Sequence, residues 1–78
     1  MTPDEPETID ARGHRCPVPT LKLRRHLAQQ PAGARVVLLA DDPMAQIDVP
    51  HFCNQNNYFL RSVEVVADGW RFEICCAD

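Results

Sequence analysis

The sequence predicts a two-layer α+β sandwich with the element order βαβαββ, in which a four-stranded mixed sheet carries two helices on one face. Two amphipathic segments alternate with short apolar runs, and Val36-Val37-Leu38-Leu39 reads as a central strand that is covered on both sides. Asp68-Gly69 then joins two strand-like runs, as in a hairpin. At 78 residues the chain forms one domain with a small core.

The amino-terminal part begins with an acidic, proline-rich segment. We expect residues 1–8 to be a flexible tail and residues 9–78 to be the folded domain, with a short first strand over Thr8–Ala11. The first helical pattern covers Thr20–Gln30 and ends at Pro31-Ala32-Gly33.

The first helix has an apolar side and a basic side. On a helical wheel the apolar arc is expected to face the core, and the polar arc to face solvent. The apolar arc contains Leu21, Leu23, Leu27 and Ala28, and the polar arc contains Lys22, Arg25, His26 and Gln29. Arg24 falls inside the apolar arc, so it either packs its stem at the arc's edge or reaches toward the end of the helix that carries Cys16.

The second half supplies the other helix and three strands. A strand over Ala34–Ala40 is followed by a helix that Asp41 or Asp42 caps, with Pro43 at its start and Asn54 to Asn57 at its end. Pro50 predicts a kink or a restart in this helix, because proline lacks the N–H that a continuous helix needs. The hairpin strands are expected over Tyr58–Val66 and Trp70–Cys76.

Charge and hydropathy disfavour two classes of function. The net charge of −3 gives no general basic field, so direct binding to nucleic acid is disfavoured and a protein partner is favoured. No apolar run is long enough to span a membrane, and the first residues do not resemble a signal peptide. We therefore expect a cytoplasmic protein whose four cysteines are reduced.

Cys16-Pro17-Val18-Pro19 is the stretch that most directly indicates chemistry. The thiol stands just before the first helix, where unpaired backbone N–H groups favour a thiolate. With Cys16 as the N-cap, the prolines leave only the Val18 N–H to point at the sulfur, so the acidification is moderate. Gly13 ends the preceding strand. Three nearby residues are expected to tune the charge on the sulfur: Arg12, His14 and Arg15.

Three segments together resemble the TusA family of small sulfur carriers. The first runs from Ile9 to Pro19 and contains Asp10-Ala11-Arg12-Gly13 and the Cys-Pro-x-Pro motif. The others are Ala40-Asp41-Asp42-Pro43 and Asp48-Val49-Pro50-His51-Phe52-Cys53. The resemblance covers nearly the whole chain after Thr8.

The resemblance implies a function and its site. Cys16 would accept sulfane sulfur as a persulfide from a cysteine desulfurase or a rhodanese-like donor, and pass it to a DsrE/TusD-like or other acceptor protein. In the best-known members the sulfur ends in 2-thiouridine of tRNA. The family's activity is of the sulfurtransferase type and implies no cofactor. Gly13, Pro17 and Pro19 are expected to shape the loop.

The basic side chains of the first helix are expected to help a partner dock. Lys22, Arg24 and Arg25 lie on the helix that presents Cys16, and a basic rim there would steer an acidic donor or acceptor.

Two alternatives remain open from the sequence. The same carrier chemistry would serve sulfur oxidation or the supply of sulfur to molybdenum cofactor, and a redox-sensing interaction module would use Cys16 without sulfur transfer. A metal site is not expected, because the His-x-Cys pairs at 14/16 and 51/53 have a spacing that splays the ligands. Cys53 is expected in the core. Cys75 and Cys76 are expected on opposite faces of the last strand.

Overall fold

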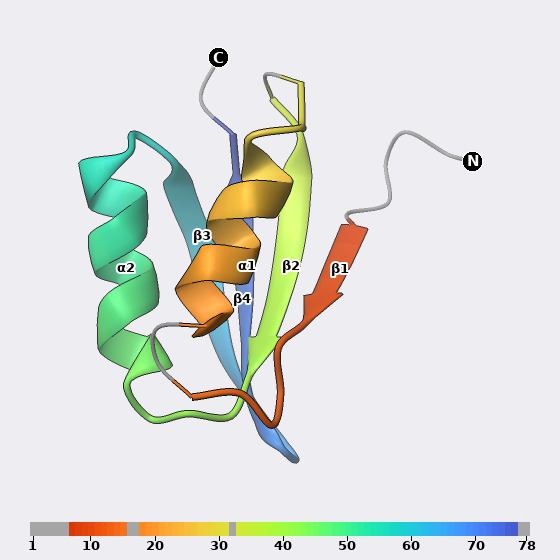
Figure 1. Cartoon of the computed structure of the whole chain (residues 1–78), viewed down its shortest axis with the longest axis vertical. Helices are drawn as coiled ribbons and strands as arrows, with labels where there is room; N and C mark the ends of the chain where they lie inside the picture. Colours follow the sequence, from red (N-terminus) through yellow and green to blue (C-terminus); the bar gives the residue numbers. More distant parts are fainter. Residues whose placement is uncertain (1–6, 16–17, 32, 77–78) are drawn as a thin grey trace.

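Four strands form one sheet, and two helices pack on the same face of it (Figure 1). This computed structural model describes residues 7–15, 18–31 and 33–76. The elements in chain order are β1 (Glu7–Asp10), α1 (Val18–Leu27), β2 (Arg35–Ala40), α2 (Ala45–Gln55), β3 (Phe59–Val66) and β4 (Gly69–Cys75). The predicted order βαβαββ and the mixed sheet are confirmed.

The strand order in the sheet is β1-β2-β4-β3. β1 runs parallel to β2, while β4 runs antiparallel to both β2 and β3. β2 is therefore an inner strand. Because β1 and β2 are parallel, α1 carries the chain from the carboxyl end of β1 back to the end of the sheet at which both strands begin. The end of β1 and the start of α1, which border the predicted reactive loop, lie at the carboxyl end of β2 (Figure 1).

The core lies between the sheet and the two helices. β2 contributes Val36, Leu38 and Ala40 to it, each fully buried, because alternate residues of a strand face one side of the sheet. The other buried residues of this core are Leu23 and Leu27 of α1, Ala45, Val49 and Cys53 of α2, Phe72 and Ile74 of β4, and, outside these elements, Ala11 and Cys76. Burial of each large apolar side chain contributes roughly 1.5–3 kcal/mol, so these few residues hold the two layers together.

The buried side of α1 differs from the predicted apolar arc. Pro19, Leu23 and Leu27 are buried, whereas Leu21 is 54% exposed and Ala28 is also exposed. Residues four apart drift by only about 40° around a helix, so the line from Pro19 to Leu27 sets the core side and leaves Leu21 on the opposite side. The prediction that Leu21 faces the core is wrong, because the wheel did not include Pro19.

α2 runs continuously through Pro50, without the predicted restart. The residues on either side of this proline in the buried row, Val49 and Cys53, hold the helix on the sheet. At its start, the Asp42 carboxylate accepts the Met44 N–H at 3.1 Å, and the Asp42 carbonyl accepts the Ala45 N–H at 2.9 Å. The N-cap position of α2 is Met44, which makes no side-chain cap; of the two predicted caps, Asp42 is the one that bonds to the turn leading into α2.

Several element boundaries lie one to three residues from their predicted positions. β1 begins at Glu7, inside the segment predicted to be a tail, because Glu7 and Thr8 pair with Val36 and Val37. α1 ends at Leu27, and a turn then covers residues 28–30. The part of the predicted tail before Glu7 lies outside the described residues.

The hairpin turns over two residues, with Val66 paired to Gly69. Gly69 has φ of +130°, a conformation that side chains disfavour. None of the helices in the described ranges is long and apolar enough to cross a membrane.

Candidate functional site

Cys16 and Pro17, the predicted reactive residue and its neighbour, lie outside the described residues. The chain is described on both sides of them, up to Arg15 and again from Val18. The four residues from Arg12 to Arg15 are all exposed. The chain therefore approaches the position of Cys16 along the protein surface.

A tight turn leads from β1 into the reactive loop. The His14 N–H donates to the Ala11 carbonyl at 3.3 Å, and Gly13 has φ of +85°, as the third residue of a type II turn requires. The Gly13 N–H then donates to both carboxylate oxygens of Asp41, at 3.0 and 2.9 Å. Gly13, predicted to shape the loop, thus anchors it to the link between β2 and α2.

On the far side of Cys16 the chain is anchored by a second backbone bond. The Val18 N–H donates to the Arg15 carbonyl at 2.9 Å, across the two residues between them. The expectation that this N–H points at the sulfur concerns Cys16, which lies outside the described residues; among the described residues the N–H is bonded to Arg15. Pro19 is buried, so it also packs the start of α1 against the rest of the protein.

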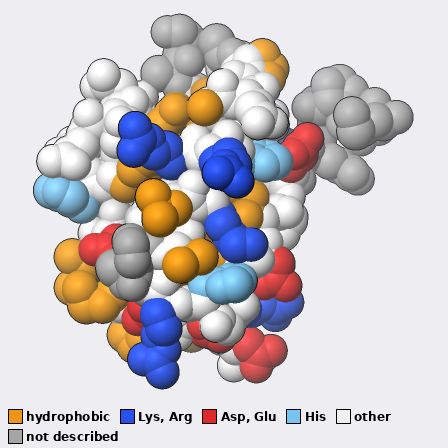
Figure 2. Space-filling model, in the orientation of Figure 1, with side chains coloured by type: hydrophobic (Ala, Val, Ile, Leu, Met, Phe, Trp, Pro, Cys, Tyr) orange, Lys and Arg blue, Asp and Glu red, His pale blue; other side chains and the backbone are white. Residues whose placement is uncertain are grey.

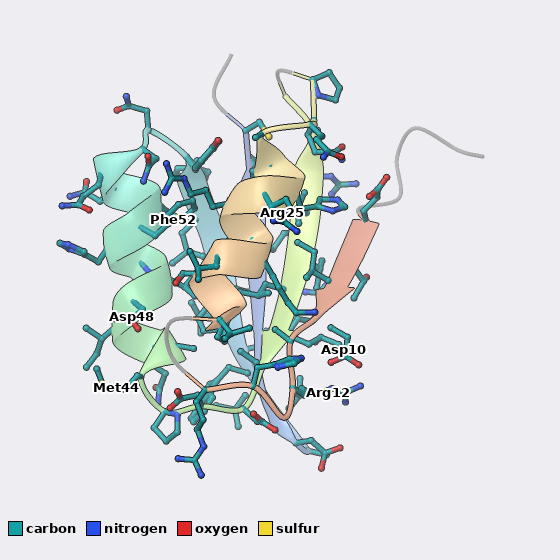
Figure 3. The ribbon with its side chains drawn as sticks, viewed as in Figure 1. Asp10, Arg12, Arg25, Met44, Asp48 and Phe52 are labelled. Carbon is teal, nitrogen blue, oxygen red and sulfur yellow. The ribbon has the colours of Figure 1, made fainter. Side chains whose placement is uncertain are left out.

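Arg12, predicted to tune the sulfur, is engaged with acidic side chains. Its Nε and Nη2 donate to the two carboxylate oxygens of Asp10, each at 2.9 Å, and its Nη1 lies 3.8 Å from an Asp68 oxygen in the hairpin turn. Figure 3 shows Asp10 and Arg12 side by side at the end of β1. The Arg12 side-chain hydrogen bonds are the largest of the influences that lower the pKa of Asp10 from 3.8 to about 2. The positive charge of Arg12 is therefore largely compensated.

His14 and Arg15 border a shallow hollow beside the reactive loop. It has a volume of about 400 Å³, and its other described lining residues are Gly13, Asp41, Asp42 and Pro43. Neither His14 nor Arg15 has a hydrogen bond or ion pair from its side chain to another described residue. These two residues are the remaining candidates for tuning the charge on Cys16.

The solvent side of α1 combines exposed apolar and basic side chains. A hollow of about 590 Å³ runs along it, and Figure 2 shows basic side chains surrounding hydrophobic ones on this face. The lining residues are Val18, Leu21, Lys22, Arg24, Arg25, Ala28 and Gln29. We call this set the α1 face.

The position of Arg24 is now defined. Arg24 is exposed, and with Leu21 it also lines a second hollow, of about 360 Å³, shared with Phe52, Gln55 and Asn56 of the α2 region. It lies on the side of α1 that faces α2, and its side chain is not packed in the core. Lys22, by contrast, is close enough to Asp10 to help lower the pKa of that carboxyl group.

The other three cysteines are placed in or near the core. Cys53 is 2% exposed in α2, as predicted, and burial raises the pKa of its thiol to about 11. Cys76 is 8% exposed, and burial followed by the neighbouring Cys75 raises the pKa of its thiol. Cys75 is half-buried. These settings suppress thiolate formation at Cys53 and Cys76.

No cluster of three or more His, Cys, Asp or Glu side chains suited to a metal ion occurs within 7–15, 18–31 and 33–76. His51 is exposed while Cys53 is buried, so these two residues of α2 face different environments.

Two residues of the site escaped the reasoning from sequence. Asp41 was predicted as a helix cap, yet its carboxylate holds the reactive loop. Leu21 was predicted in the core, yet it lies on the α1 face. The signal for Asp41 was present in the pair Asp41-Asp42, because one helix start needs only one of the two carboxylates as its cap.

Comparison with known proteins agrees with this geometry. The fold superimposes on a SirA-like protein from Desulfitobacterium hafniense with a TM-score of 0.79 and 25% sequence identity, over 91% of this chain and 97% of that one. A family model described as sulfurtransferase TusA matches residues 7–75, which contain all of the described elements together with the Cys-Pro-x-Pro motif. With both its sheet topology and its reactive-loop sequence accounted for in this way, the chain belongs to the TusA sulfurtransferase family.

Proposed function

We propose that this protein is a persulfide carrier in which Cys16 receives a sulfur atom from one protein and delivers it to another. Membership of the TusA family supports the general role of a sulfur carrier. Four exposed residues, Arg12 to Arg15, precede the Cys-Pro-x-Pro motif, and its last two residues, Val18 and Pro19, begin α1. The proposed location is the cytoplasm, where the thiols stay reduced.

The proposed transfer is a nucleophilic displacement on sulfur. The Cys16 thiolate attacks the terminal sulfur of a donor persulfide, so that a new S–S bond forms on Cys16 and the donor's S–S bond breaks. The donor leaves as a thiolate, and the transferred sulfur arrives with its proton as Cys16–S–SH. An acceptor thiolate then attacks that terminal sulfur and regenerates the Cys16 thiolate. The two steps balance without an external oxidant or reductant.

The anchoring of the loop on both sides is the observation that carries this proposal. Before Cys16, the Gly13 N–H is bonded to the Asp41 carboxylate. A second hydrogen bond, from the Val18 N–H to the Arg15 carbonyl, joins the residues on the two sides of Cys16 and Pro17. A thiol that must enter the sites of two different partners needs an exposed chain around it and fixed positions for the residues that flank it. The exposure of Arg12 to Arg15 and the hydrogen bonds of Gly13 and Val18 support both. Pro17 and Pro19 complete the proposed loop-shaping set with Gly13, and the burial of Pro19 supports its part in it.

The α1 face is the proposed docking surface for donor and acceptor. Lys22, Arg24 and Arg25 surround the exposed Leu21, and α1 carries no acidic residue. A partner with carboxylates around an apolar side chain complements such a surface. Because α1 starts two residues after Cys16, docking there brings the partner's sulfur toward the loop.

The donor we propose is a cysteine desulfurase, and the final product is 2-thiouridine of tRNA, as the family resemblance implies. Incubation with a purified cysteine desulfurase and cysteine tests the carrier step. Intact mass spectrometry should show the gain of one sulfur atom, located on Cys16 by peptide mapping and absent in Cys16→Ser. A wild-type protein that gains no sulfur but forms a sulfenic acid or mixed disulfide on oxidation would support the redox-sensing alternative. Transfer onward is tested by measuring 2-thiouridine in tRNA from cells that lack the chain.

A further inference from the structure

Two segments that are distant in sequence meet the reactive loop at the carboxyl end of β2. The first is the link between β2 and α2, where the Asp41 carboxylate accepts the Gly13 N–H with both oxygens, at 3.0 and 2.9 Å. The second is the β3–β4 turn, where Asp68 lies 3.8 Å from Arg12. The described part of the loop before Cys16 is thus bound to the rest of the domain through Arg12 and Gly13.

Asp41 has no part in starting the helix that follows it. In the turn that leads into α2, its neighbour Asp42 accepts the Met44 N–H with its carboxylate and the Ala45 N–H with its backbone carbonyl. Asp42 is also nearly buried, at 9% exposed, while Asp41 is exposed. The described hydrogen bonds of the Asp41 side chain go only to Gly13, so this carboxylate serves the loop.

The backbone of Asp41 lies close to the hairpin turn. A Cβ added to Gly69 would overlap the Ala40 carbonyl oxygen and lie 2.8 Å from the Asp41 Cα. Only glycine allows the turn to approach the end of β2 this closely. The close approach leaves Asp41 little freedom to move toward β4, so its carboxylate meets Gly13 from a defined position.

We propose that Asp41 is a positioning residue for sulfur transfer, which acts by holding Gly13, three residues before Cys16, while the close packing of Gly69 limits where Asp41 can lie. The inference rests on the proposed carrier function. Transfer between two sulfur atoms requires a near-linear approach at short range, so a loop that wanders by about 1 Å loses a large part of the rate. Asp41 restricts the movement of Gly13 at the start of the loop.

Two substitutions at Asp41 test this role. Asp41→Ala removes the acceptor for the Gly13 N–H, whereas Asp41→Asn keeps an oxygen in the same place and removes the charge. Loading of Cys16 by cysteine desulfurase is measured as kcat and KM, with Glu64→Ala as the control for loss of an exposed carboxylate elsewhere on the sheet. Asp41→Ala should lower kcat by about fivefold to tenfold with KM within about twofold of wild type. Asp41→Asn and Glu64→Ala should load at nearly the wild-type rate.

Two results would overturn the proposal: a wild-type kcat in Asp41→Ala, or an Asp41→Asn variant as slow as Asp41→Ala. Should Asp41→Ala fail to fold, Asp41→Glu replaces it, because the longer side chain displaces the carboxylate from Gly13. That variant should show the same loss of kcat, and a wild-type rate there would refute the proposal.

A separate readout distinguishes this inference from the carrier function. The rate of Cys16 alkylation by iodoacetamide, followed against pH by peptide mapping, needs no protein partner. Asp41→Ala should change this pH–rate profile while Asp41→Asn restores it. If wild-type protein takes up no sulfur from the desulfurase, the carrier function fails, and the alkylation profiles alone decide whether Asp41 positions the loop.

Discussion

Arg12 donates two side-chain hydrogen bonds to Asp10, with Nε and Nη2 each 2.9 Å from a different carboxylate oxygen. The Arg12 backbone N–H adds a third bond to the same carboxylate, at 3.1 Å. The pair closes the end of β1 just before the chain turns at Gly13. It therefore couples the stability of the loop's first residues to the ionisation of Asp10.

The first prediction concerns acid stability. The hydrogen bonds from Arg12 lower the pKa of Asp10 from 3.8 to about 2, so the ionised form favours the folded state. This contribution is fully present above pH 3.8, the ordinary pKa, and is lost as the pH falls through about 2. Asp10→Asn should flatten the fall of the melting temperature over this window. Arg12→Gln should flatten it as well, because without the guanidinium group the pKa of Asp10 returns toward its value in the unfolded chain. A fall of the melting temperature that is the same in both variants as in wild type would contradict the assignment.

The second prediction compares two glycines that both have positive φ. Gly13 has φ of +85° and no atom within 4 Å of an added Cβ, so Gly13→Ala meets only conformational strain. We expect a loss of about 1–2 kcal/mol in the free energy of unfolding, measured by urea denaturation. Gly13→Asn should lose less, since asparagine tolerates this conformation. Equal losses for alanine and asparagine would argue against a strained backbone.

The third prediction is that Gly69→Ala is more harmful than Gly13→Ala. The added methyl group would overlap the Ala40 carbonyl oxygen, which the sheet prevents from moving freely. We expect the strain of Gly13→Ala plus about 1–3 kcal/mol from overpacking. Urea denaturation of the two variants under identical conditions measures the difference. A Gly69→Ala protein as stable as Gly13→Ala would mean that the turn is free to move away from β2.

The fold was predictable from the sequence because its signals are local. The apolar run at 36–39, the prolines around the start of α1 and the Asp68-Gly69 turn each mark one element, and the element order then leaves few topologies. The errors arose where the outcome depends on a distant contact. Asp41 binds Gly13 across 28 positions of sequence, and no local pattern distinguishes it from Asp42 as a cap.

The geometry around the candidate site was less predictable than the fold. Cys-Pro-x-Pro indicates the Cys16 thiol from the sequence, and that role stays a prediction, but the burial of Pro19 and the exposure of Leu21 follow from how α1 rests on the sheet. A helical wheel reports which residues share a side of a helix. Which side meets the core depends on packing that the wheel does not contain.

The fourth prediction is that the Cys53 thiol does not react with alkylating reagents in the folded protein. Its thiol is 2% exposed, and burial raises its pKa to about 11. Iodoacetamide at pH 8 should leave Cys53 unmodified in the folded protein and should modify it fully in denaturant, as read by peptide mapping. Cys53→Ser should lower the free energy of unfolding by roughly 1–3 kcal/mol, because it buries a hydroxyl group in an apolar site. Rapid labelling of native Cys53 would show that α2 opens readily.

The last prediction separates the basic and apolar contributions of the α1 face to docking. Arg25→Glu reverses a charge beside the exposed Leu21, and Arg61→Glu makes the same change in net charge on β3. Affinity for cysteine desulfurase, measured by titration calorimetry, should fall about tenfold in Arg25→Glu at low salt and should approach wild type at high salt, where screening is strong. Arg61→Glu should bind nearly as wild type.

Leu21→Ser should also weaken binding, but by a factor that does not change with salt, because this variant loses apolar contact and no charge. If Arg25→Glu and Arg61→Glu weaken binding equally, the net charge of the protein and not the α1 face determines the affinity. If Leu21→Ser binds as tightly as wild type, the partner does not dock on the α1 face.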